Sequence, residues 1–213
     1  MKKITLLSSI LVMLCCSLSH GQGIGYGFKL GVNVSQINSF SFDVVNISGG
    51  TPTQDNSSSI DESRIGFTAA FFAEIPINER LSFQPEFAYS SQGNKFEGLR
   101  YEYLQLPLAL KINLNKLFIN AGPQVGLKIS AFEQSDNFSS FEFAGFGGLG
   151  YQFTDNIFIE ARYTVGFTEV FEDDAAIELP MFSENSNEAN RDTVLTNTEG
   201  KNSYFTLSIG YRL

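Results

Sequence analysis

The chain has 213 residues, of which 43% are hydrophobic and 17% are charged, and its formal net charge is −9. This length fits one all-β domain or at most two small domains. Because the sequence has no basic patch, a polyanion-binding role is not expected, and nucleic acid is excluded as a partner.

The first 21 residues have the layout of a secretory signal peptide. Lys2 and Lys3 precede an apolar stretch over residues 4–14, and small residues follow up to Gly21. The apolar stretch is too short to anchor the chain in a bilayer. We therefore expect cleavage near Gly21, leaving residues 22–213 as one domain.

Cleavage removes Cys15, Cys16 and His20, which are the only cysteines and the only histidine of the chain. The mature chain then has neither disulfides nor zinc ligands of thiolate or imidazole type. Enzymatic outer-membrane barrels usually use chemistry that resembles Ser/His or Asp/His pairs, and the mature chain has no histidine. We therefore expect no enzyme and no cofactor. Removal of two lysines leaves 12 basic and 23 acidic residues, a formal charge of −11.

From Tyr26 onward, apolar and polar residues alternate with period two, in segments long enough to cross a membrane as tilted strands. In the last segment the apolar residues Phe205, Leu207, Ile209, Tyr211 and Leu213 alternate with polar or small ones. The eight segments are 26–35, 64–75, 81–90, 104–112, 117–129, 141–153, 157–165 and 204–213. The pattern predicts an all-β, eight-stranded, antiparallel up-and-down transmembrane β-barrel.

The connections between these segments alternate in length. Three are tight turns, over 76–80, 113–116 and 154–156, and four are longer, over 36–63, 92–100, 130–139 and 168–202. This asymmetry is typical of an outer-membrane barrel with periplasmic turns and extracellular loops.

A soluble carrier of the lipocalin type also alternates along each strand, so the contents of the two faces decide which one meets water. One face is bulky, aromatic and free of charge at the strand centres, whereas the other is rich in Gly, Ala and Ser. A charge at the bilayer midplane costs about 2–4 kcal/mol. We therefore expect the apolar face to contact lipid.

The small polar face carries scattered charges that would lie in a narrow bore. These are Lys29, Arg64, Glu74, Glu86, Lys111, Lys128, Glu142, Glu160, Arg162 and Arg212. Buried charges need partners, so we interpret them as a structural salt-bridge network filling the lumen. The alternative is a selectivity lining for a pore.

The last long connection, 168–202, is strongly acidic. Glu172, Asp173 and Asp174 offer oxygen ligands for a divalent cation such as Ca²⁺, although they lack the glycine-punctuated spacing of a calcium loop. A solvated, repelling surface is the favoured interpretation. Apolar residues within it suggest a strand extension beyond the membrane. The first long loop, rich in Ser and Asn over 46–59, has the composition of a mobile segment.

Two further patterns are discounted. Gly145, Gly147 and Gly150 spell the G-x-G-x-x-G fingerprint, but no helix follows, so we expect small residues here because the strand curves or because large neighbours need room. Glu142 and Glu160 could act as an acid/base pair, yet both are expected in the interior near basic partners, where structural pairing is favoured.

The sequence resembles the outer-membrane β-barrel proteins of the Bacteroidetes, often labelled porin-like or PorT-like. The resemblance rests on "GFKLGVNVS", "GFTAAFFAEIPINERLSFQPEFAYSSQG", "YLQLPLALKINL", "NAGPQVGLKIS", "FGGLGYQFTDNIFIEARYTVGF" and the closing "YFTLSIGYRL". It implies insertion by the barrel-assembly machinery through the C-terminal segment, although that segment ends in Leu213 rather than phenylalanine. The family shares no single activity.

The leading hypothesis is an integral barrel of the bacterial outer membrane with a structural or interaction role, whose outer loops meet an unknown envelope or extracellular partner. The second is a narrow channel for small solutes, and the third is a soluble periplasmic carrier.

Overall fold

The computed structural model describes residues 23–46, 63–93, 100–131, 139–170, 177–179 and 193–213. These form one antiparallel sheet that closes on itself, because β1 pairs with β2 on one side and with β9 on the other. The strands are β1 (Gly25–Asn46), β2 (Arg64–Pro76), β3 (Leu81–Gly93), β4 (Arg100–Leu114), β5 (Leu117–Ala131), β6 (Phe141–Gln152), β7 (Ile157–Glu169), β8 (Ile177–Leu179) and β9 (Thr193–Arg212). Eight strands make the wall, and the short β8 adds to the outer part of β9. The predicted eight-stranded barrel is confirmed.

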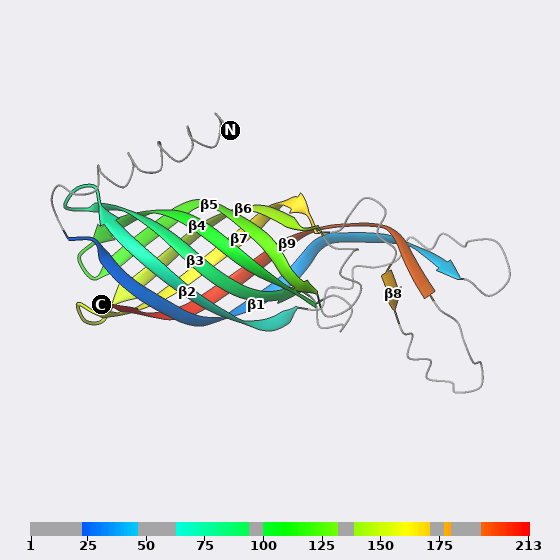
Figure 1. The fold of residues 1–213 in the computed structure, drawn as a ribbon, viewed down its shortest axis with the longest axis horizontal. Helices are drawn as coiled ribbons and strands as arrows, with labels where there is room; N and C mark the ends of the chain where they lie inside the picture. Colours follow the sequence, from blue (N-terminus) through cyan, green and yellow to red (C-terminus); the bar gives the residue numbers. More distant parts are fainter. Residues whose placement is uncertain (1–22, 47–62, 94–99, 132–138, 171–176, 180–192) are drawn as a thin grey trace, which may run out of the picture.

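Three tight turns lie at one end of the barrel, which we call the turn end (Figure 1). In the β2–β3 turn, the Asn78 side-chain oxygen accepts hydrogen bonds from the backbone N–H groups of Arg80 and Leu81. In the β4–β5 turn, Asn115 has φ 56°, a left-handed conformation that asparagine tolerates well. The Thr154 hydroxyl similarly accepts from Asn156 and Ile157. Local side-chain chemistry thus explains why these connections are short.

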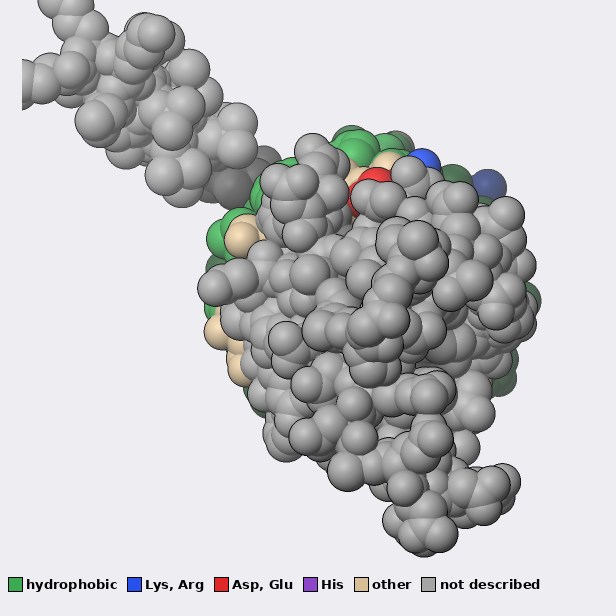
Figure 2. All heavy atoms as spheres, turned by 90° about the vertical axis from the view of Figure 1, so that its right-hand side faces the viewer, with side chains coloured by type: hydrophobic (Ala, Val, Ile, Leu, Met, Phe, Trp, Pro, Cys, Tyr) green, Lys and Arg blue, Asp and Glu red, His purple; other side chains and the backbone are tan. Residues whose placement is uncertain are grey.

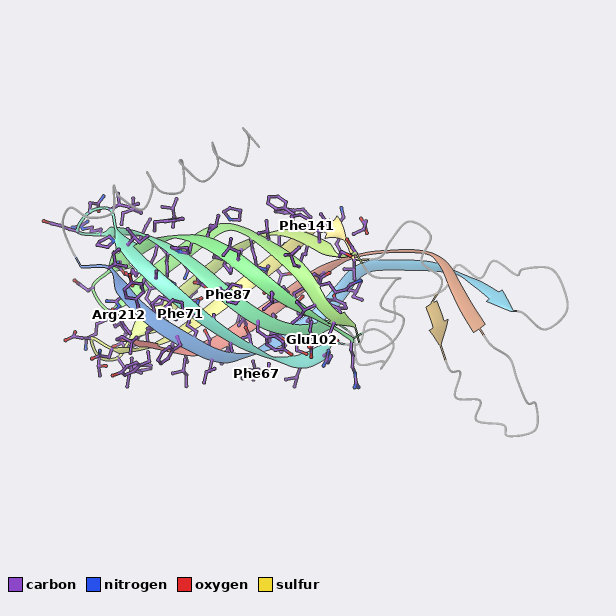
Figure 3. The ribbon with its side chains drawn as sticks, viewed as in Figure 1. Phe67, Phe71, Phe87, Glu102, Phe141 and Arg212 are labelled. Carbon is purple, nitrogen blue, oxygen red and sulfur yellow. The ribbon has the colours of Figure 1, made fainter. Side chains whose placement is uncertain are left out.

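Most of the large apolar residues of every wall strand point outward. On β1, for example, Phe28 is 47% exposed, whereas the neighbouring Lys29 is only 5% exposed and points into the bore. Phe67, Phe71, Phe87 and Phe141 likewise lie on the outside (Figure 3). Viewed along the barrel from the opposite end, the loop end, the described side chains visible around the outline are mostly hydrophobic (Figure 2). This arrangement confirms the lipid-facing assignment and contradicts the soluble-carrier alternative.

Two predicted loops are shorter than expected. β1 continues to Asn46 and β9 begins at Thr193, so that parts of the expected connections 36–63 and 168–202 are strand. The two extensions pair with each other, up to Asn46 with Thr193. They continue past Arg64, the first residue of β2, at the loop end (Figure 1). Mutual pairing satisfies the backbone groups on the edges that face each other, which favours strands here. We call residues 36–46 and 193–202 together the ribbon.

Residues 47–59 of the Ser- and Asn-rich loop lie outside the described residues. So do Glu172, Asp173 and Asp174. Over the described part of the chain, no helix is long and apolar enough to span a membrane.

Candidate functional site

The centre of the bore is occupied by two cations and two carboxylates. Lys29 Nζ on β1 lies 2.8 Å from a Glu86 oxygen on β3 and 3.2 Å from a Glu160 oxygen on β7. Arg162, also on β7, lies 2.9 Å from Glu86 and 2.7 Å from Glu160. All four side chains are at most 7% exposed. We call them the central tetrad. Its formal charges balance, and each carboxylate has two cationic neighbours, which offsets part of the cost of burial.

A second ionic cluster closes the turn end of the bore. Glu74 on β2 accepts from Lys111 Nζ at 3.0 Å and from the guanidinium of Arg212 on β9. Asn113 also lies within 3.5 Å of Glu74. Arg212 appears near the turn end in Figure 3. These contacts join β2, β4 and β9 across the lumen.

Three phenylalanine rings fill the bore beside this cluster. Phe72, Phe118 and Phe158 form a buried core with edge-on contacts, their ring centroids 5.6 to 5.8 Å apart. Lys111 Nζ lies 4.4 Å from the centroid of Phe118, a cation–π distance. The rings fill this part of the bore, and Lys111 lies over the face of Phe118.

Each of these rings lies over a glycine directly opposite on the neighbouring strand. Phe72 pairs with Gly27, Phe118 with Gly150, and Phe158 with Gly210. A Cβ added at any of the three glycines would collide with the ring. The alternation of the strands predicts Phe72 inside, but Phe118 and Phe158 are missed by sequence reasoning. The signal that could find them is an inward phenylalanine with a glycine at the cross-strand position.

The loop-end layer of the lumen is held by amides and a phenol. Glu142 accepts hydrogen bonds from Asn202 at 3.0 Å and Gln105 at 3.1 Å, and these donors are amides rather than the basic side chain expected from the sequence. The Tyr204 hydroxyl accepts from Gln105 at 3.0 Å and Gln124 at 2.6 Å. This layer joins β4, β5, β6 and β9.

The remaining predicted lumen residues lie near the loop end. Arg64 donates to the backbone oxygen of Gln92 and, at 3.1 Å, to the Ser91 hydroxyl. Lys128 is half-buried on β5 opposite Tyr103. Of the ten charged residues expected in the lumen, seven thus belong to the two ionic clusters, and Arg64, Lys128 and Glu142 do not.

Little empty space remains between these layers. A cavity of about 30 Å³ adjoins the central tetrad and is lined also by Gln105, Gln124 and Tyr204. This volume holds only one or two water molecules, so side chains nearly fill the bore beside the tetrad. A wider depression of about 260 Å³ opens at the turn end, beside Glu74, Asn78 and Arg212.

The other patterns singled out in the sequence fall as follows. Gly145, Gly147 and Gly150 lie within the uninterrupted strand β6, and Gly150 gives room to Phe118. Among the described residues, no group of three or more His, Cys, Asp or Glu side chains could hold a metal ion. The residues of the expected insertion segment point outward on β9 or just after it: Phe205, Leu207, Ile209, Tyr211 and Leu213.

Among solved structures, Neisserial surface protein A shares 13% identity and a TM-score of 0.49, covering 90% of this chain and 100% of its own. OprG from Pseudomonas aeruginosa shares 14% identity and a TM-score of 0.47, covering 92% and 98%. Ail of Yersinia pestis, solved in complex with the heparin analogue sucrose octasulfate, shares 16% identity and a TM-score of 0.44, covering 90% and 100%. No curated protein matches the chain.

A family model described as "Outer membrane protein beta-barrel domain" matches residues 18–172, nearly three quarters of the chain. The match spans seven of the eight wall strands, from β1 to β7. Together with the closed wall and its apolar exterior, it places the protein in the bacterial outer membrane. The chain belongs to the outer-membrane β-barrel domain family.

Proposed function

We propose that this outer-membrane barrel is a closed scaffold that carries the ribbon to a partner in the envelope or outside the cell. The scaffold part rests on the filled lumen, and the interaction part rests on the ribbon. The same proposal takes the loop end to face outward and assigns the protein neither catalysis nor a cofactor.

The layered lumen supports a scaffold rather than a channel. A solute would have to displace the central tetrad and then the rings of Phe72, Phe118 and Phe158. Removing one partner from a buried ion pair costs about 3–5 kcal/mol, because the other charge is left without compensation. A pore is therefore disfavoured by the side chains that hold the barrel together.

The ribbon is the observation that carries the interaction role. The pairing of β1 with β2 ends at Ser35, whereas its pairing with β9 continues for another eleven residues, about 35 Å at strand spacing. Along residues 37–46, the other edge of β1 has no strand partner among the described residues. Free strand edges accept an extended segment of another protein by main-chain hydrogen bonding.

Three finer points belong to the proposal. Residues 1–21 act as a signal peptide, the C-terminal segment from Phe205 to Leu213 is the signal for the barrel-assembly machinery, and the chain is a porin-like or PorT-like protein of Bacteroidetes type. The alternating outward residues of β9 support the second point, and the sequence resemblance supports the third. Cation binding by Glu172, Asp173 and Asp174 stays a prediction.

Conductance of residues 22–213, refolded and inserted in planar bilayers, tests the scaffold. We expect no steady openings, in the wild type or in the Lys128→Gln variant. Steady openings whose ion selectivity changes in Arg162→Gln or Lys128→Gln would support the narrow channel instead.

Shortening the ribbon tests the interaction role. Residues 37–46 and 193–201 are each deleted, and the two cut ends are rejoined with short turns, so that the barrel wall up to Ser35 is kept. The shortened barrel should still show heat-modifiable migration in gels, as folded barrels do. Cross-linking on intact cells should give adducts with the full-length protein that the shortened one lacks. Identical adducts from both proteins would reject this role.

A further inference from the structure

Three consecutive wall strands carry a proline in their middle. Pro85 lies on β3, Pro107 on β4 and Pro123 on β5, each within a strand that has neighbours on both sides. Proline has no N–H group, so it is normally confined to edge strands or bulges. Three such residues side by side in a membrane wall need an explanation.

The ladder is interrupted at each proline without a change of register. Between β2 and β3, the pairs run from Phe72–Glu86 directly to Ile75–Phe83, and the pair that would join Ala73 to Pro85 is absent. The pairs of β3 and β4 likewise skip Glu86–Pro107 and its neighbour Phe87–Leu106.

Between β4 and β5, the pairs Leu108–Pro123 and Ala109–Gly122 are skipped in the same way. A Cβ on Gly122 would collide with the Leu108 carbonyl oxygen, so the backbones approach closely where the hydrogen bond is missing. The carbonyls of Ala73, Glu86 and Leu108 therefore lack the ladder donor that any other residue would supply.

The three prolines lie at nearly the same height along the barrel, within one residue of each other in the register of β3, β4 and β5. Pro85 is paired with Leu108, which faces Pro123 on its other side, and Pro107 lies one position away. By contrast, the pairs of β7 and β9 continue without a gap from Ile157–Tyr211 to Val165–Ser203. The weak region is thus confined to one side of the barrel.

The cavity beside the central tetrad lies directly behind this region. Glu86, Ala88, Gln105 and Pro107, which flank the gap between β3 and β4, all line it. On the lipid side the gap is covered by Phe87 and Leu106, which are 58% and 43% exposed. Only the width of the sheet separates a polar cavity from the bilayer here.

We propose that β3 and β4 separate at Phe87 and Leu106, forming a lateral opening that connects the cavity with the bilayer. In lipid, a broken ladder bond has no water to replace it, so an intact wall resists opening. Where the bonds are already missing, opening costs less. The inference is independent of the proposed function, which concerns passage along the bore and the ribbon.

Cysteine labelling tests the opening. Residues 22–213 contain no cysteine, so Ala88→Cys places one thiol at the buried lining of the cavity. In lipid vesicles it should react with a membrane-soluble maleimide faster than with a charged, membrane-impermeant one. The matched control is Ala144→Cys, which is also buried but lies on β6, whose pairs with β5 and β7 are unbroken. It should react at least about fivefold more slowly, the factor that one net hydrogen bond supplies.

Adding Pro107→Ala restores an N–H opposite Glu86 and should slow labelling of Ala88→Cys about fivefold. Equal rates for Ala88→Cys and Ala144→Cys, or no effect of Pro107→Ala, would overturn the proposal. If a variant does not fold, hydrogen exchange on the unaltered chain decides. Amides over 84–88 and 104–108 should exchange at least about fivefold faster than those over 159–163 and 207–211, and uniform exchange would overturn the opening.

Discussion

Arg212 on β9 forms an ion pair with Glu74 on β2, reaching past β1, which lies between the two strands. The same carboxylate binds Lys111 on β4 at 3.0 Å. One glutamate therefore links strands from both sides of the point where the sheet closes, and it compensates a lysine that is only 2% exposed.

Glu74→Gln should destabilise the barrel by about 3 kcal/mol, because it leaves Lys111 buried without its carboxylate. Urea unfolding of the refolded protein in detergent measures the loss. Circular dichroism follows the unfolding, because the chain has no tryptophan for fluorescence. Glu79→Gln in the exposed β2–β3 turn is the matched control and should change stability by less than about 0.5 kcal/mol. Equal effects of the two substitutions would contradict the linking role of Glu74.

The central tetrad should respond to charge balance more than to the number of contacts. Glu86→Gln leaves Lys29 and Arg162 with a single carboxylate, Glu160, and should cost about 3–5 kcal/mol. The double variant Glu86→Gln with Lys29→Met keeps the balanced Arg162–Glu160 pair, so we expect it to be more stable than Glu86→Gln alone. The same urea titrations compare the two, and additive losses would show that balance is not the controlling quantity.

The contact between Phe118 and Gly150 can be tested with one methyl group. Gly150→Ala should cost about 1–3 kcal/mol, because its Cβ collides with the ring of Phe118. Gly147→Ala on the same strand is the control: a Cβ there meets nothing within 4 Å, so stability should stay nearly unchanged. Combining Gly150→Ala with Phe118→Leu should cost less than the two single losses added together. Simple additivity in this cycle would argue against the steric cause.

The cost of a charged residue on the outward face should depend on its depth in the bilayer. Leu207→Arg, near the middle of the part of β9 that pairs with β7, should cost about 2–4 kcal/mol in lipid vesicles. Phe153→Arg in the β6–β7 turn should cost only about 0–1 kcal/mol. Reversible folding into vesicles of phosphatidylcholine measures both values. A cost for Phe153→Arg as large as that for Leu207→Arg would contradict the assignment of the turns to the membrane surface.

The wall of the barrel is predictable from sequence because period two and alternating loop lengths are local properties. Residues such as Phe28 and Lys29 are assigned to opposite faces by parity alone, and the structure agrees. The tight turns are equally local, since Asn78 and Thr154 form them with their own neighbours.

Lumen contacts are less predictable because they join strands that are far apart in the sequence. Lys29 and Glu160 are 131 residues apart, and no local pattern selects Glu160 rather than Glu142 as the partner. Glu142 instead meets Asn202, a residue that the sequence places in a loop. For the ribbon, the sequence suggests a strand extension within 168–202 but misses its partner, residues 36–46, because the two segments pair only in the folded chain.

The central tetrad also bears on how the barrel keeps its shape. Its members come from β1, β3 and β7, so the ion pairs connect opposite parts of the wall across the bore, as spokes connect a rim. Spokes of this kind resist flattening of the circular cross-section into an oval. When the bilayer thickness changes, the barrel should therefore change its tilt relative to the membrane normal and keep its diameter.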